Sequence, residues 1–217
     1  MSDRRGPFDD LLPGIRVGID MDGVLADFNT GWMTRYNLEF GTDLTPDLVD
    51  HWDAASDLTH FPDLCEFWDW AGAAGGGPSV FRNLSLYPGA RRALCDLAAD
   101  HDVVILSMKP DWAAADTFAW IGDRHIPTRE VHLLRDKWLV DCDVYLDDSP
   151  HVVPKLVEYR PESIVCRYVR PWNGPVAGAA DVEPVSTGSD SGEAQAVAPA
   201  AEADAVGEPS LPAMASG

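Results

Sequence analysis

The chain has 217 residues, with 36 acidic against 16 basic side chains, a formal net charge of −20 and an isoelectric point near 4.4. This acidity excludes binding to nucleic acid polymers and to anionic membrane surfaces, because both need a basic patch. No apolar run reaches the roughly 18 residues that span a bilayer, and residues 1–10 lack the pattern of a signal peptide, so we expect a cytoplasmic protein.

Short apolar runs alternate with helical stretches along the first 174 residues. The pattern predicts strands at 15–19, 103–106, 131–134, 144–146 and 164–168. It predicts helices at 28–40, 88–99, 113–122 and 154–159. Strands that alternate with helices in this way are typical of an α/β fold with a parallel sheet.

The stretch 29–84 breaks this alternation. It is rich in Trp, Phe, Asp and Pro and includes three consecutive glycines at 75–77. Because it is longer than a normal crossover between two strands, we expect a small domain inserted after the first strand. The core would then comprise residues 1–28 and 85–174.

The composition changes again in residues 175–217. This segment holds twelve Ala, five Pro, five Gly, five Ser and seven acidic residues, but no aromatic residue, Lys or Arg. Such a segment buries too little apolar surface to offset the entropy of ordering it. We therefore predict a disordered acidic tail.

Paired carboxylates follow two of the predicted strands. Asp20 and Asp22 come directly after the first strand, and Asp147 and Asp148 follow the strand at 144–146. In a parallel sheet, ligands gather beyond the carboxyl ends of the strands. Carboxylates brought together there repel each other unless a cation lies between them, and an oxygen-only ligand set favours Mg²⁺.

The first acidic pair, taken alone, would not establish a metal site. A single D-x-D motif is commonly a turn or a helix cap. A calcium-binding EF-hand loop also begins D-x-D, but the apolar Val24, Leu25 and Ala26 stand where that loop needs further oxygen ligands. Two acidic strand ends together therefore favour a metal site.

Phosphoryl chemistry also needs cations and hydrogen-bond donors. Lysine is scarce in this chain, and Lys109 and Lys137 both follow predicted strands. Either could be an ordinary surface lysine, although its position near the acidic sheet edge favours function for Lys137. The hydroxyl of Ser107, at the end of the second strand, would face the same edge.

These residues, taken in chain order, resemble the four motifs of the haloacid dehalogenase superfamily of phosphotransferases: Asp20-x-Asp22-Gly23, Ser107, Lys137 and Asp147-Asp148. Three phrases are similar to its 5′(3′)-deoxyribonucleotidases of the cytosolic type C family: DMDGVLADF at 20–28, YPGA at 87–90 and RDK at 135–137. The resemblance covers about residues 15–170. It implies a three-layer, Rossmann-like core with a small helical cap at 29–84.

The resemblance also implies roles for the acidic residues. Asp20 would be the nucleophile that forms an aspartyl-phosphate, and Asp22 would protonate the leaving group and then activate water. Asp20, the backbone carbonyl of Asp22 and Asp148 would hold Mg²⁺. Asp147 would orient this metal shell or Lys137.

The same resemblance implies contacts to the phosphate and the substrate. Gly23 would let the backbone approach the phosphate, and Ser107 and Lys137 would donate to its oxygens. Arg135 and Lys109 are further candidates for phosphate or substrate contact. We expect these five residues to line one pocket.

An aromatic pocket would hold the base of a nucleotide. The positions that resemble it are Phe28, Trp52 and Phe81, because a flat base stacks on aromatic faces. We expect Trp68 and Trp70 in the core of the cap rather than in this pocket. Met108 would also line the substrate site, at a position where eukaryotic relatives carry a second hydroxyl residue.

We therefore expect a Mg²⁺-dependent 5′-nucleotidase that hydrolyses (deoxy)ribonucleoside monophosphates to nucleoside and phosphate. One alternative is a phosphatase of the same superfamily acting on another small phosphomonoester. Another is a non-catalytic binding module that uses the acidic tail, although the complete motif set argues against it. The oligomeric state stays open, a homodimer included.

Overall fold

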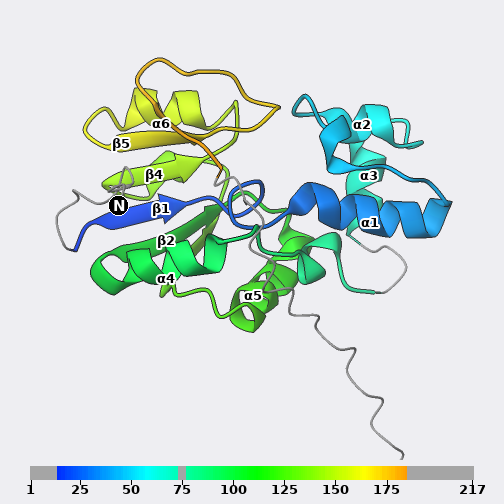
Figure 1. The fold of residues 1–217 in the computed structure, drawn as a ribbon, viewed down its shortest axis with the longest axis horizontal. Coiled ribbons are helices and arrows are strands. Elements are labelled where there is room, and N and C mark those ends of the chain that lie inside the picture. The colour runs from blue at the N-terminus through cyan, green and yellow to red at the C-terminus, as the bar shows by residue number, and fades with distance from the viewer. Residues whose placement is uncertain (1–13, 73–76, 185–217) are drawn as a thin grey trace, which may run out of the picture. The chain divides into compact units, whose positions relative to one another are not determined.

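A computed structural model describes residues 14–72 and 77–184 of the chain (Figure 1). Its centre is a six-stranded, wholly parallel sheet in the order β3-β2-β1-β4-β5-β6. The strands are β1 (Arg16–Ile19), β2 (Asp102–Ser107), β3 (Glu130–Leu133), β4 (Val144–Asp147), β5 (Ile164–Tyr168) and β6 (Ala180–Val182). Strands β2 and β3 lie on one side of β1, and the later strands β4, β5 and β6 lie on its other side, so the strand order reverses at β1. Ligands of open α/β sheets bind at such a point.

Both faces of the sheet are buried, as strand β2 shows. Successive side chains of a strand point to opposite faces of the sheet. In β2, Val103 and Ile105 pack into one apolar cluster while Val104 and Leu106 pack into a second. Helices α4 (Ala90–Asp100) and α5 (Ala114–Asp123) contribute to the first cluster, and α6 (Val153–Tyr159) contributes to the second. The core is therefore a three-layer α/β structure.

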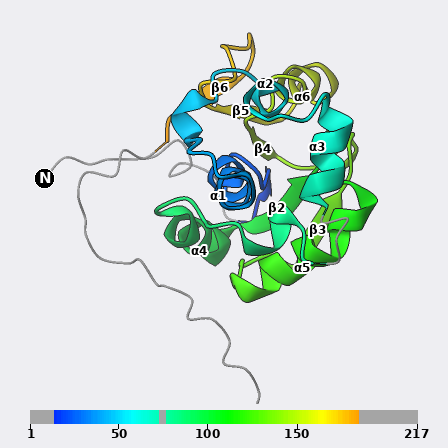
Figure 2. The same cartoon turned by 90° about the vertical axis from the view of Figure 1, so that its right-hand side faces the viewer.

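The insertion, residues 29–84, supplies helices beyond the carboxyl ends of the strands (Figures 1 and 2). Its helices are α1 (Phe28–Phe40), which begins one residue before it, α2 (Ala54–Leu58) and α3 (Leu64–Ala71), with the short 3-10 helices η1 (Pro46–Leu48) and η2 (Val80–Asn83). Buried aromatic rings of α1 and α3 hold it together, with Trp32 packed edge-to-face on Tyr36 and Phe67. The remaining 3-10 helices are η3 (Asp111–Ala113) and η4 (Lys137–Leu139).

A tight loop joins β1 to α1 and anchors the returning chain. Ala26 pairs with Leu86 in an antiparallel bridge, so the insertion leaves and re-enters the core at neighbouring points. Asp27 caps α1, since its side chain accepts from the backbone N of Thr30 at 3.1 Å. Gly23 adopts φ +78°, a left-handed conformation that glycine tolerates best.

The structure confirms the predicted strands and helices to within two residues at each end and adds one strand. Strand β6 lies at Ala180–Val182, inside the segment assigned from its composition to the tail. It pairs with β5, and Arg167 of β5 supports the pairing because it binds both carboxylate oxygens of Asp181 at 2.7 and 2.9 Å. The sheet therefore includes residues beyond 174, where the sequence predicts a disordered tail.

Some expectations lie outside the described residues: the tail from residue 185 on, residues 1–13 of the core, and two of the three glycines at 75–77. Within the described residues, no helix is both long and apolar enough to cross a membrane.

Candidate active site

Three carboxylates meet where β1 and β4 end. Asp20 follows β1, Asp147 is the last residue of β4, and Asp148 comes next. One oxygen of each lies within 4.8 Å of the others, and all three residues are buried. This acidic cluster confirms that the two acidic strand ends converge, as the parallel sheet predicts.

Lys137 is the cation of the acidic cluster. Its Nζ lies 2.9 Å from Oδ1 of Asp20 and 2.6 Å from Oδ2 of Asp147, and its side chain is 3% exposed. Burial opposes the charge, but the attraction of Asp147 and Asp20 outweighs it and raises the pKa of Lys137. Lys137 therefore stays charged and holds Asp20 and Asp147 in place.

Asp148 has a different environment. Its Oδ2 accepts from the indole Nε1 of Trp172 at 2.9 Å, while its Oδ1 is buried with no hydrogen-bond partner among the described residues. Burial, with repulsion from Asp20 and Asp147, raises the pKa of Asp148 well above its usual range. A buried carboxylate oxygen without a partner is costly and fits a site completed by a cation.

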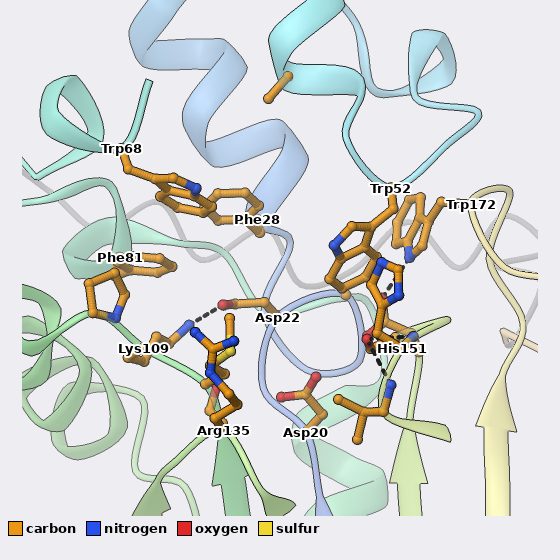
Figure 3. A pocket seen from close by; sticks show the side chains of 18 of the residues that line it. Asp20, Asp22, Phe28, Trp52, Trp68, Phe81, Lys109, Arg135, His151 and Trp172 are labelled. Atoms are coloured by element: carbon orange, nitrogen blue, oxygen red, sulfur yellow. Dashed lines mark hydrogen bonds and ion pairs between the residues drawn. The ribbon is translucent and has the colours of Figure 1, made fainter. Parts of the chain in front are cut away.

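Asp22 does not join the acidic cluster. Its Oδ2 forms an ion pair with Lys109, whose side chain is fully buried and lies 3.9 Å from the centre of the Phe81 ring. Burial raises the pKa of Asp22 and lowers the pKa of Lys109, and the attraction between them opposes both shifts. In Figure 3, Asp22 lies on the side of Asp20 that faces the aromatic rings of the insertion.

A cavity of about 1070 Å³ opens above the carboxylates. Every residue predicted for the site lines it except Asp147, which lies beneath, bonded to Lys137. Ser107 is buried at the end of β2, whereas Met108 is 53% exposed. Arg135 points into the cavity beside Lys109 (Figure 3).

Aromatic rings form two walls of this cavity. On one side Phe28 stacks on Phe81 and on Trp68, with ring centres 5.4 and 5.7 Å apart. On the other side lies Trp52, which is 43% exposed and contacts His151 edge-to-face. Flat rings that line a cavity above an acidic floor are suited to a ligand with an aromatic end and an anionic end.

Sequence reasoning misses part of this site. It predicts Trp68 in the core of the cap, but Trp68 lines the cavity and stacks on Phe28. Its neighbour Trp70 is not among the lining residues. His151 and Trp172 also line the cavity, and no motif or spacing marks either of them.

The donor set suits magnesium. The acidic cluster offers only carboxylate oxygens, which hard cations such as Mg²⁺ prefer. The unpartnered Oδ1 of Asp148 is already positioned for such a contact. Lys109 engages Oδ2 of Asp22, while Oδ1 of Asp22 is buried with no hydrogen-bond partner among the described residues. The metal contact expected of this residue is its backbone carbonyl.

Comparisons with known proteins agree with this geometry. The family described as "5′ nucleotidase, deoxy (Pyrimidine), cytosolic type C protein" matches residues 14–174. A 5′(3′)-deoxyribonucleotidase of Clostridium acetobutylicum is 28% identical over 138 residues, or 62% of this chain and 73% of that protein. The mitochondrial 5′(3′)-deoxyribonucleotidase of Homo sapiens is 27% identical over 152 residues, or 64% of each chain.

The fold has solved counterparts. An HAD-hydrolase of Bacillus subtilis, YfnB, solved bound to magnesium, superposes with a TM-score of 0.54 over 78% of this chain and 94% of its own. The two sequences are 10% identical, so this likeness concerns the fold alone. The fold is that of the haloacid dehalogenase-type hydrolases.

Proposed function

Because the chain belongs to the family of cytosolic type C deoxy(pyrimidine) 5′ nucleotidases, and is therefore a hydrolase, we propose that it removes phosphate from (deoxy)ribonucleoside monophosphates with the help of Mg²⁺. One observation carries the proposal. The acidic cluster with Lys137 forms the floor of a cavity whose walls are stacked aromatic rings. Phosphate and base would occupy these two ends.

Asp20 is the proposed nucleophile. One carboxylate oxygen would attack the phosphorus atom, the bond from phosphorus to the nucleoside oxygen would break, and an aspartyl-phosphate would form on Asp20. The 2.9 Å contact with Lys137 supports this role, because the ammonium group holds the orientation of the Asp20 carboxylate. Ser107 and Lys137 would donate to the phosphoryl oxygens.

Asp22 is the proposed general acid and base. It would give a proton to the departing nucleoside oxygen and then take one from the water that attacks the aspartyl-phosphate, which regenerates Asp20 and releases phosphate. Its position supports the assignment, since it lies on the side of Asp20 that faces the insertion, where the nucleoside would leave. Lys109 would orient Asp22 and stabilise charge on the phosphate.

Magnesium would be held by carboxylate oxygens of Asp20 and Asp148, together with the backbone carbonyl of Asp22. When bound, it neutralises negative charge on the phosphoryl group. Asp147 would act indirectly, because its oxygens are engaged by Lys137 and by the backbone N of Ser149. Gly23 leaves room for this arrangement, since a Cβ there would lie 2.0 Å from Oδ2 of Asp148.

The aromatic wall of Phe28, Trp68 and Phe81 would receive the base. Stacking on such rings contributes about 1–3 kcal/mol per base. Trp68→Ala, which removes a partly exposed ring of this wall, should therefore raise KM for dTMP about tenfold while leaving hydrolysis of a small sugar phosphate unchanged. Equal loss with both substrates would contradict the assignment of this wall to the base.

Phosphate release tests the proposal. Purified full chain with Mg²⁺ should release phosphate from dUMP and dTMP faster than from ribose 5-phosphate or glucose 6-phosphate at the same concentration. Asp20→Asn or a chelator should abolish release, while the exposed Asp43→Asn, a matched change away from the cavity, should leave it unaltered. Faster release from the sugar phosphates would instead identify a phosphatase for another small monoester, and release that survives in Asp20→Asn would refute the mechanism.

A further inference from the structure

A turn that follows β5 contacts the acidic cluster, although none of the motifs in the sequence includes it. We call Arg170–Asn173 the 170–173 turn; Asn173 closes it by donating its backbone N to the carbonyl of Arg170 at 3.2 Å. The Oδ1 of Asn173 accepts from the backbone N of Arg170 at 3.1 Å. The turn is therefore closed by two hydrogen bonds and presents its side chains in fixed directions.

Two of these side chains bind Asp148. The indole Nε1 of Trp172 donates to Oδ2 at 2.9 Å, and Nδ2 of Asn173 donates to the backbone carbonyl of Asp148 at 2.7 Å. These contacts fix both the carboxylate and the main chain of the residue. Oδ1 of Asp148 is buried and has no partner in the part of the chain that the structure describes.

Arg170 links the turn to the loop after β1. Its Nε donates to the carbonyl of Gly23 at 2.7 Å, and its guanidinium lies over the rings of Tyr87 and Tyr168 at 4.1 and 4.7 Å. Gly23 in turn leaves the space that Oδ2 of Asp148 occupies. The turn thus holds Asp148 and the glycine beside it together.

The turn is anchored on its far side by the added strand. Arg167 of β5, which is 4% exposed, donates to Oδ1 of Asn173 at 2.7 Å and binds both carboxylate oxygens of Asp181 in β6. A continuous set of hydrogen bonds therefore runs from β6 through Arg167 and Asn173 to Asp148.

We propose that the 170–173 turn is a positioning element for the metal, in which Trp172 takes Oδ2 of Asp148 and so leaves Oδ1 as the oxygen that binds the cation. This inference rests on the proposed Mg²⁺ site. Groups that hydrogen-bond a metal ligand fix its orientation, and their loss costs about 10–100-fold in metal affinity. Trp172, Asn173 and Arg170 act through Asp148 and are positioning residues.

The test measures metal binding directly. Full chain is titrated with Mn²⁺, which uses the same oxygen ligands as Mg²⁺, and free Mn²⁺ is quantified by electron paramagnetic resonance. Trp172→Phe keeps a large ring but removes the indole donor. We expect its Kd for Mn²⁺ to rise about tenfold, and saturating Mg²⁺ to restore phosphate release.

Trp70→Phe is the matched control. The indole of Trp70 also donates to a carboxylate at 2.9 Å, that of Glu39, away from the residues that line the cavity. Both variants lose an indole-to-carboxylate hydrogen bond, and only Trp172→Phe should weaken Mn²⁺ binding. A rise in Kd of threefold or more in Trp172→Phe, with Trp70→Phe unchanged, supports the proposal, and a smaller rise overturns it.

A second variant covers the case in which Trp172→Phe does not fold. Asp181→Asn loosens the anchor of Arg167 at the half-exposed edge of the sheet, far along the hydrogen-bond path from Asp148. A threefold or greater rise in its Kd supports the proposal, and anything less overturns it. Wild-type chain that binds no Mn²⁺ and releases no phosphate would contradict the proposed function itself. If wild-type chain and the turn variants instead bind Mn²⁺ equally tightly, only the proposal for the turn fails.

Discussion

Replacement of Lys137 by methionine should destabilise the folded chain strongly. Its Nζ lies 2.6 and 2.9 Å from oxygens of Asp147 and Asp20, and the three side chains are at most 9% exposed. At an effective dielectric constant of about 20, each contact is worth about 6 kcal/mol of gross attraction, most of which offsets the cost of burying the charges. Removing one partner of a buried pair leaves the other charge uncompensated, so we expect Lys137→Met to lower the free energy of unfolding by about 3–5 kcal/mol.

Urea denaturation at pH 7 without divalent metal measures this loss. Lys155→Met, which removes an exposed lysine whose Nζ lies 5.1 Å from the centre of the Trp138 ring, should change the free energy of unfolding by less than about 1 kcal/mol. The double variant Lys137→Met/Asp147→Asn should recover part of the loss, because it removes an uncompensated carboxylate as well as the lysine. A loss below about 1 kcal/mol in Lys137→Met, within the range of surface ion pairs, would refute the reasoning.

Two further predictions concern a glycine and a peripheral ion pair. Gly23→Ala should abolish phosphate release, since its Cβ would lie 2.0 Å from Oδ2 of Asp148. Gly89 has a similar φ of +81°, against +78° for Gly23, but open space around it, so Gly89→Ala should cost only about 1–2 kcal/mol of stability. Similar phosphate release by the two variants would contradict the steric argument. Hydrogen bonds from Arg16 and His132 lower the pKa of Glu130 to about 2, below its ordinary value of 4.5, so this carboxylate stabilises the fold above about pH 4.5 and loses that effect as the pH falls towards 2. Glu130→Gln should therefore reduce stability at pH 7, by less than about 1 kcal/mol because the pair is partly exposed, and the difference should disappear in denaturation measured near pH 2.

The sequence predicts the sheet well because its strands are buried on both faces. Apolar runs such as that of β2 stand out against polar helices, and parallel strands bring Asp20 and Asp148 to one edge without knowledge of any contact. The carboxylates of the candidate site are predictable for this reason. The residue that pairs with each carboxylate cannot be predicted in the same way, because an ion pair such as that between Lys109 and Asp22 joins residues 87 positions apart.

The parts that escape prediction depend on tertiary contacts. Trp68 lies next to buried Phe67 on α3, and only the stacking on Phe28 places it in the cavity. The strand β6 has a composition typical of a disordered segment, and one arginine of β5, Arg167, holds it through Asp181. Trp172 stands just before that segment, so nothing in its surroundings marks it as a partner of the acidic cluster.

The most direct test of the proposed chemistry follows the phosphoryl group. The chain is mixed with dUMP carrying ³²P in its phosphate and with Mg²⁺, quenched in acid during turnover and digested. The mechanism predicts label on the peptide that contains Asp20, and none in the Asp20→Asn variant. Release of labelled phosphate by a chain that never carries label on that peptide would contradict it.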